Sequence, residues 1–325
     1  MNARKKVSIL AEQIQAIKRH INSVKNTEKI TGAMKLISAA KLKQSTDHLN
    51  YAKDHIEPLI SKFTQILTCD IAPEIYYEKR LDMRQFEVGT VPHSSEAPIK
   101  ELCILITSCK GLCGGYNSSL IKHAADMNEN AGIIFVPLGD KGFNYCIKHG
   151  LEVFSADAFA DTYSDHAHEL SYERIHKVAS AVLELYRKSE ISKVKIVYTK
   201  YRNPIAFDID TKLLFPLEKA APGEDGDIEN TNLFDHDKDS SYFDELAVAY
   251  LSMKILRYIA EATLCEHAAR RIAMKNANDN ALKMIETLSN KYHTARQNAI
   301  TGEMIEIIVG HESQKMKKVQ KKIGE

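Results

Sequence analysis

Residues 265–281 read CEHAARRIAMKNANDNA, a stretch with the composition of a helix but almost nothing large to bury. It contains five alanines, and Ile272 and Met274 are its only large aliphatic side chains. Near the other end of the chain, in ITGAMKLISAAKLKQ at 30–44, an apolar helical row similarly thins to small residues. Because helices lined with small side chains can approach closely, we predict that the two stretches pair within an antiparallel coiled coil.

Long helices are predicted at both ends of the chain because helix breakers are missing there. No proline precedes Pro58 or follows Pro222, and no glycine occurs in the 75 residues from Asp227 to Thr301. Two rows recur every seven positions in the first helix: Leu42, Leu49 and Ile56, with Ser45, Ala52 and Leu59 beside them. At 1.5 Å per residue, helices of ~50 and ~70 residues would extend about 75 and 105 Å. A plain helical bundle would need more leucine and isoleucine than these stretches contain.

The middle of the chain alternates apolar runs with helical stretches. The runs are IKELCILITS (99–108), AGIIFVPLG (131–139), LEVF (151–154), KVKIVYTKY (193–201) and IAFDIDTKLLFP (205–216), and the last two are expected to pair. Strands that alternate with helices are typical of a parallel α/β sheet. The predicted fold class is therefore α/β, a Rossmann-like domain inserted between the N- and C-terminal helices of a long antiparallel coiled coil. The predicted divisions are a helix (1–62), a connecting segment (63–98), the α/β domain (99–217), an acidic linker (218–241) and a last helix with a basic extension (242–325).

A glycine loop, SCKGLCGGYNSS at 108–119, follows the first predicted strand. Phosphate sites often form at such turns, because the amides of a helix N-terminus point at the ligand. The loop matches neither G-x-G-x-x-G nor G-x-x-x-x-G-K-[ST], however, and no acid ends the next strand. We therefore expect Gly111, Gly114 and Gly115 to supply a tight turn and a surface for another protein. No catalytic or metal-binding motif occurs, and no cofactor is expected.

Charge is distributed unevenly along the chain. Residues 1–62 carry a net +7 and residues 246–325 a net +5, so the total of +1 leaves −11 for the residues between them. Basic ends indicate a polyanionic partner or acidic protein surfaces, or simply the solvated faces of long helices. No apolar run approaches the ~20 residues that a membrane span needs, and no secretory signal is present. We expect an intracellular protein whose six cysteines are reduced.

Four blocks carry a resemblance to a known family, and they cover nearly the whole chain. They are SVKNTEKITGAMKLISAAKLKQ (23–44), LITSCKGLCGGYNS (105–118), EHAARRIAMKNANDNA (266–281) and YHTARQNAITGEMIEII (292–308). In this order they closely resemble the gamma subunits of F-type ATP synthases. The resemblance implies a rotating central shaft inside a ring of alpha and beta subunits, with the α/β domain beside epsilon and the membrane c-ring. Catalysis would belong to beta, and the chain would couple ion flow to ATP synthesis or hydrolysis.

The resemblance also implies which residues touch the stator. Met34 and Lys35 match shaft positions near the lower loops of beta, and Arg270 matches an arginine that faces the same acidic loops. Three upper positions match residues that touch the stator catch: Gln297, Thr301 and Glu303. Since no transit peptide is seen, the implied location is the cytoplasmic face of a bacterial inner membrane, as a peripheral subunit.

Two features depart from the family pattern. Cys109 and Lys110 stand where the family commonly has an acid in its ITS-D-R-G turn, and the basic stretch HESQKMKKVQKKIGE (311–325) runs on where many relatives stop. That stretch would form either a longer shaft tip or a frayed tail. Two rival functions also stay open: a coiled coil that binds nucleic acid and a nucleotide-dependent α/β enzyme. Neither accounts for the matched small-residue blocks, and the acidic middle opposes nucleic acid.

Overall fold

The computed structural model of the chain describes residues 3–68, 72–76, 100–128, 132–154, 172–217 and 240–323. The chain forms two compact units: one consists of residues 1–37 with 273–325, and the other of residues 38–272. Much of the predicted connecting segment (63–98) and nearly all of the acidic linker (218–241) lie outside the described residues.

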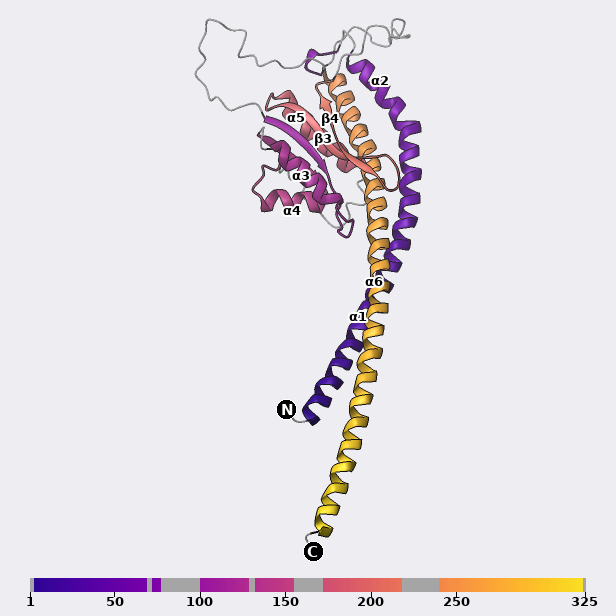
Figure 1. Cartoon of the computed structure of the whole chain (residues 1–325). Helices are drawn as coiled ribbons and strands as arrows, with labels where there is room; N and C mark the ends of the chain where they lie inside the picture. Colours follow the sequence, from indigo (N-terminus) through magenta and orange to yellow (C-terminus); the bar gives the residue numbers. More distant parts are fainter. Residues whose placement is uncertain are drawn as a thin grey trace. The chain divides into compact units, whose positions relative to one another are not determined.

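Both ends of the chain are long helices, as predicted (Figure 1). Helix α1 spans Ala3–Tyr51 and continues through a π-helical turn, Ala52–Ile56, into α2, Glu57–Leu67. Helix α6 spans Ser240–Ile323, which is 84 residues, or about 126 Å at 1.5 Å per residue. It is therefore longer than the ~70 residues expected, because most of the basic extension continues the helix.

The π-helical turn changes which residues of the N-terminal helix face inward. Before this turn, Ser45 and Leu49 are buried as the sevenfold rows predict, and Ala52 at its start is buried as well. The next predicted member, Leu59, is 41% exposed, whereas Ile60 is buried. A π turn holds one residue more than the α-helical repeat, so the inward face moves on by one position. The expectation for Leu59 is therefore wrong.

The α/β domain is built on a four-stranded sheet with the order β2-β1-β3-β4. Its strands are β1 (Lys100–Ile106), β2 (Ile133–Leu138), β3 (Ile191–Tyr201) and β4 (Phe207–Phe215). Strand β1 is parallel to both β2 and β3, and β4 is antiparallel to β3, as the paired runs predict. The run at 151–154 forms only a single parallel bridge, between Val153 and Phe135. The predicted α/β fold class is confirmed.

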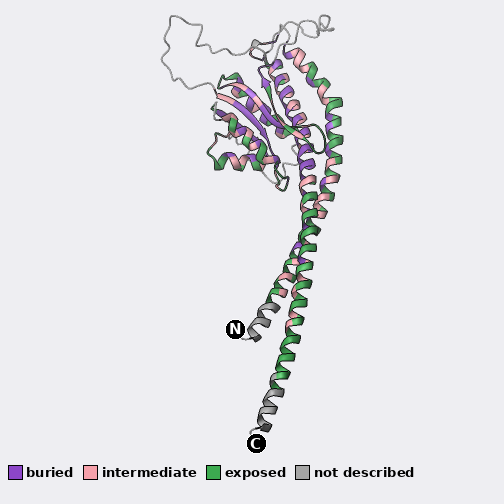
Figure 2. Ribbon diagram, in the orientation of Figure 1, coloured by how far each residue is buried: buried purple, intermediate pink, exposed green. Residues whose placement is uncertain are grey.

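Helices cover both faces of the sheet, and the buried residues gather there (Figure 2). Helices α3 (Tyr116–Asn128) and α4 (Asp140–Lys148) lie on one face, while α5 (Tyr172–Arg187) and the first part of α6 lie on the other. Successive side chains of a strand point to opposite faces. Leu102 and Ile104 of β1 accordingly join the α5 and α6 core, whereas Cys103 and Leu105 join the α3 core.

In the unit of residues 1–37 and 273–325, α1 and α6 form an antiparallel pair. Val24, Ala281 and Leu288 are buried together, and Nδ2 of Asn278 donates to the carbonyl oxygen of Glu28 at 3.0 Å. Val24 thus lies near Ala281, and Glu28, which is later in the chain, contacts Asn278, which is earlier. The two helices therefore run in opposite directions, as in the predicted antiparallel coil.

The two small-residue stretches meet, as their composition predicts. Gly32 comes so close to α6 that a Cβ atom on it would lie 3.4 Å from Nδ2 of Asn278. In the other unit, Ser45 lines one cavity together with Thr263 and Glu266. None of the helices in the described ranges is long and apolar enough to cross a membrane.

Candidate functional site

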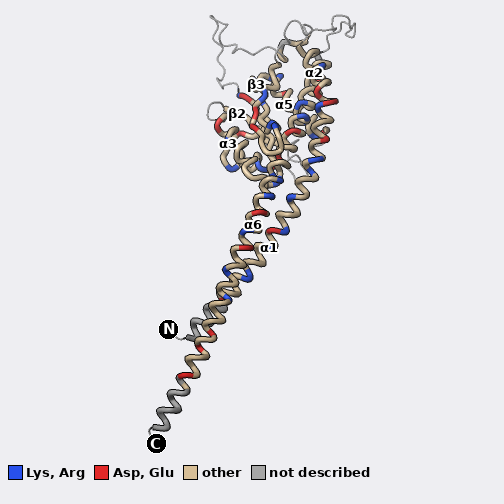
Figure 3. Tube along the Cα trace, turned by 45° about the vertical axis from the view of Figure 1, so that its right-hand side comes forward, with Lys and Arg blue, Asp and Glu red and all other residues tan. Residues whose placement is uncertain are grey.

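The first predicted contact region lies on α1. Met34 and Lys35 are half-buried there, and the adjoining Leu36 and Ile37 are exposed. Lys and Arg positions recur along α1 and α6, interspersed with acidic ones (Figure 3). Exposed apolar side chains next to basic ones are typical of a surface that meets another protein.

The second predicted contact region lies near the end of α6. Gln297, Thr301 and Glu303 are all exposed. The hydroxyl of Thr301 donates to the carbonyl oxygen of Gln297 at 2.9 Å, a local bond within the helix. These side chains therefore extend outward from the helix, where a surrounding subunit could reach them.

The same part of α6 is apolar on more than one side. Its exposed large apolar residues are Ile300, Met304, Ile305, Ile307, Ile308 and Val309. Ile307 is 72% exposed. At 3.6 residues per turn these positions spread over more than half of the helix circumference. A helix that is apolar around so much of its surface is normally enclosed by other protein.

The glycine loop between β1 and α3 is held by the side chain of Asn117. Its Oδ1 accepts from the backbone N–H of Ser108 at 3.1 Å, and its Nδ2 donates to Oγ of Ser108 at 2.7 Å and to Sγ of Cys113 at 3.1 Å. The hydroxyl of Ser108 in turn donates to the carbonyl oxygen of Lys110 at 2.8 Å. These bonds tie the two ends of the loop together.

The tip of the loop has a constrained backbone. Gly114 has a φ of 61°, the left-handed region that glycine adopts without strain, and Leu112 has a φ of 64° although it is not glycine. Leu112 is also 61% exposed. Of the three glycines in the predicted tight turn, Gly114 is the one whose backbone φ favours glycine. A Cβ on Gly111 or Gly115 would meet only ordinary contacts at 3.8 Å.

Arg270 lies against this loop instead of facing outward. Its side chain is 9% exposed and its Nη2 lies 2.7 Å from Oε1 of Glu266. The guanidinium donates to the carbonyl oxygen of Lys110 at 3.0 Å and to that of Gly111 at 3.3 Å, and Nη1 donates to Nδ1 of His267 at 3.3 Å. The resemblance implied an arginine directed at a neighbouring subunit, whereas in this chain the guanidinium is bound to the chain's own backbone.

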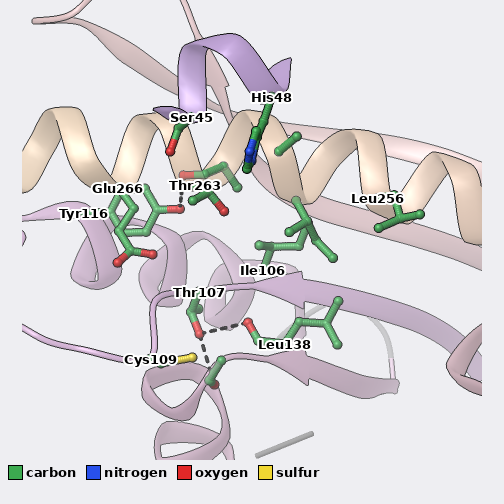
Figure 4. Close-up of a pocket in the computed structure, with 14 residues that line it drawn as sticks. Ser45, His48, Ile106, Thr107, Cys109, Tyr116, Leu138, Leu256, Thr263 and Glu266 are labelled. Carbon is green, nitrogen blue, oxygen red and sulfur yellow. Dashed lines mark hydrogen bonds between the residues drawn. The ribbon is translucent and has the colours of Figure 1, made fainter. Parts of the chain in front are cut away.

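A cavity of about 380 Å³ lies beside the loop (Figure 4). Its walls come from β1, β2, α3, α6 and the N-terminal helix, and Cys109, Tyr116 and Glu266 contribute to them. Tyr116 donates its hydroxyl proton to the carbonyl oxygen of Ala262 at 3.1 Å, and burial raises its pKa well above the usual value. The hydroxyl group therefore anchors α3 to α6. The described residues contain no group of three metal-ligating side chains.

Sequence reasoning found the loop but missed its partner on α6. The residues that Arg270 contacts, Lys110 and Gly111, are about 160 positions away in the chain. One sequence feature could have pointed to a changed contact at this loop. Cys109 and Lys110 stand where the family commonly has an acid next to this turn.

Comparison with known proteins identifies the family. The profile of the family described as ATP synthase matches residues 13–313. An ATP synthase gamma chain from Halothermothrix orenii is 31% identical over 309 residues, which cover 94% of this chain and 100% of that one. The chain belongs to the ATP synthase gamma chain family. Gamma chains of Geotalea daltonii and Geobacter sp. (strain M21) are 32% and 30% identical and cover 92% of this chain and 98% of their own length.

Solved structures agree with this membership in fold. A chain of the Euglena gracilis mitochondrial ATP synthase (OSCP/F1/c-ring) matches with a TM-score of 0.62 at 19% identity, over 95% of this chain and 96% of that one. The resemblance seen in the sequence and the predicted fold class are thus confirmed.

Proposed function

We propose that this gamma chain turns inside a ring of alternating alpha and beta subunits and couples rotation to their nucleotide chemistry. The observation that carries the proposal is the apolar, exposed segment of α6 between Ile300 and Val309. A helix with apolar side chains over more than half of its circumference needs protein on more than one side, and a ring supplies it. The α/β domain would bind epsilon and the membrane c-ring.

Coupling follows from differential contact. An asymmetric shaft that touches each beta subunit differently favours a different conformation in each, so that rotation changes their affinities for nucleotide in turn. Met34 and Lys35 would contact the lower beta loops, and Gln297, Thr301 and Glu303 the upper catch. The chain itself would hold no catalytic site, and the c-ring would determine whether protons or sodium ions drive the rotor.

The glycine turn would present a contact of its own. Gly111, Gly114 and Gly115 shape a loop from which Leu112 projects into solvent beside the exposed Lys110. An apolar tip next to a positive charge suits an acidic partner surface with an apolar rim. The bacterial relatives support a peripheral position on the cytoplasmic face of the membrane.

The test is reconstitution with the cognate alpha and beta subunits, with ATP hydrolysis measured with and without this chain. We expect hydrolysis to depend on the chain. We also expect the double variant I307S/I308S to assemble at least roughly tenfold more weakly, because burial of one isoleucine contributes about 1.5 to 3 kcal/mol. Ile147→Ser, which changes an isoleucine on α4 whose exposure of 60% lies between those of Ile307 and Ile308, is the matched control. A ring that neither binds the chain nor changes its turnover would refute the proposal and direct attention to nucleic acid.

The basic extension is tested in the same assay. A chain cut after Gly310 loses the helical stretch that ends at Ile323. If the lysines of that stretch attract an acidic stator surface, the cut weakens assembly more at low salt than at high salt. Equal loss at both salt concentrations would exclude an electrostatic role.

A further inference from the structure

Arg270 is buried and makes its hydrogen bonds within the chain. Its side chain is 9% exposed, and all three nitrogens of its guanidinium group donate within the chain, to Lys110, Gly111 and His267. Glu266, also buried, balances its charge. A planar guanidinium that bridges two adjacent carbonyl oxygens is a rigid connector, because its donors are fixed in one plane.

The loop is therefore held from two sides. Asn117 binds Ser108 and Cys113, and Arg270 binds the carbonyl oxygens of Lys110 and Gly111. Leu112 lies between these attachments with its positive φ. A non-glycine residue keeps such a conformation only where its surroundings over-determine it.

The hydrogen bonds from Arg270 to Lys110 and Gly111 form a brace between the loop and α6. The position of Arg270 along α6 suggests what this brace does. Arg270 lies on α6, three residues before Ala273, where the second segment of the other compact unit begins. We propose that Arg270, charge-balanced by Glu266, is a positioning residue that fixes the Lys110–Leu112 turn to α6, so that the turn moves as one body with the shaft helix. The proposal rests on the rotor function above and assigns Arg270 an indirect part in it.

Arg271 provides a matched control for this proposal. It is the next residue on α6, carries the same charge and is exposed. If charge on this part of the helix matters only through a neighbouring subunit, Arg271 is the better placed of the two. If the brace matters, only Arg270 affects the loop.

The first experiment uses the isolated full-length chain. Cys113 is buried inside the loop, so the rate at which iodoacetamide alkylates it, followed by peptide mass mapping, reports loop opening. We expect Arg270→Met to raise this rate by on the order of tenfold or more, Arg271→Met to leave it unchanged, and Arg270→Lys to restore part of the protection. The paired variant R270M/E266Q avoids a buried unpaired carboxylate and keeps the test valid if R270M does not fold. Unchanged protection in the folded R270M or R270M/E266Q chain would overturn the proposal.

The second experiment uses the reconstituted complex and a double-mutant cycle. If Arg270 acts through the turn, Arg270→Met and Leu112→Ala change ATP hydrolysis non-additively, since removal of Leu112 removes what Arg270 positions. Additive effects would mean that Arg270 acts independently of the turn, and would refute the inference. A complex that does not assemble even with the unaltered chain would refute the rotor proposal, whereas the alkylation result would still decide whether the brace exists.

Discussion

Replacement of Asn278 with alanine is expected to loosen the antiparallel pair of α1 and α6. Asn278 is buried, and its Nδ2 donates to the carbonyl oxygen of Glu28 at 3.0 Å and to Oε1 of the same residue at 3.3 Å. Nδ2 also lies 3.5 Å from the hydroxyl of Thr31. A single buried asparagine in a helix pair fixes the register, because any other alignment leaves its amide unpaired.

The magnitude follows from these bonds. Each hydrogen bond contributes a net ~0.5 to 1.5 kcal/mol. The loss stays small because the groups that Asn278 contacts keep other partners: the Thr31 hydroxyl also donates to the carbonyl oxygens of Thr27 and Glu28. Alanine recovers up to ~0.7 kcal/mol through its higher helix propensity. We therefore expect a loss of about 1 kcal/mol in the free energy that holds the pair closed, which is roughly a fivefold change in the opening equilibrium.

Native-state hydrogen exchange measures this local opening directly. The amides of α1 around Val24 should exchange roughly fivefold faster in Asn278→Ala, while those of the β1 and β3 strands keep their rates. Asp279→Ala removes a polar side chain from the next, exposed position of α6 and serves as control. Equal acceleration by both variants, or none by Asn278→Ala, would refute the assignment of Asn278 as a register contact.

Three further predictions concern stability and reactivity. Burial raises the pKa of Glu101, but hydrogen bonds from two lysines of β3 outweigh it and hold the pKa below its usual value. This group therefore stabilises the fold above its unfolded-state pKa and loses that effect as the pH falls through the folded value. In urea denaturation Glu101→Gln should cost up to about 1 kcal/mol at pH 7 and nothing once the carboxyl is protonated; a pH-independent difference would contradict this. Gly139→Ala should lower the melting temperature markedly, because a Cβ there would lie 2.2 Å from the carbonyl oxygen of Thr107, whereas Gly302→Ala, with nothing within 4 Å, should stabilise α6 by up to about 1 kcal/mol; similar melting temperatures would refute the comparison. Iodoacetamide at pH 8 should alkylate Cys109 before the four buried cysteines of the described residues, since burial raises the pKa of three of those thiols to about 11 or 12; earlier loss of a buried thiol would contradict the burial pattern.

Much of the fold was predictable because it depends on local properties of the chain. The absence of glycine and proline predicts long helices, since these residues are the ones that end or weaken a helix. The alternation of apolar runs with amphipathic stretches predicts the parallel sheet and its helices. Individual strands were less accurately predicted, as the single bridge at Val153 illustrates.

The site was only partly predictable, and Leu59 and Arg270 illustrate why. The sevenfold rows of α1 predict that Leu59 faces inward, but the π turn displaces the row by one residue. No side chain in that turn predicts a π turn from the sequence. The motif around Arg270 identifies the family, yet not the direction of the guanidinium. Its partners at Lys110 and Gly111 are brought to it only when α6 packs against the sheet.

The two long terminal helices, the α/β class and the family follow from the sequence alone, because composition, periodicity and motif order are properties of neighbouring residues along the chain. The hydrogen-bond partners of Asn278 and Arg270, in contrast, depend on how the chain packs in three dimensions. Hydrogen bonds with fixed geometry depend on where distant backbone segments come to rest, and those positions follow from packing of the whole unit.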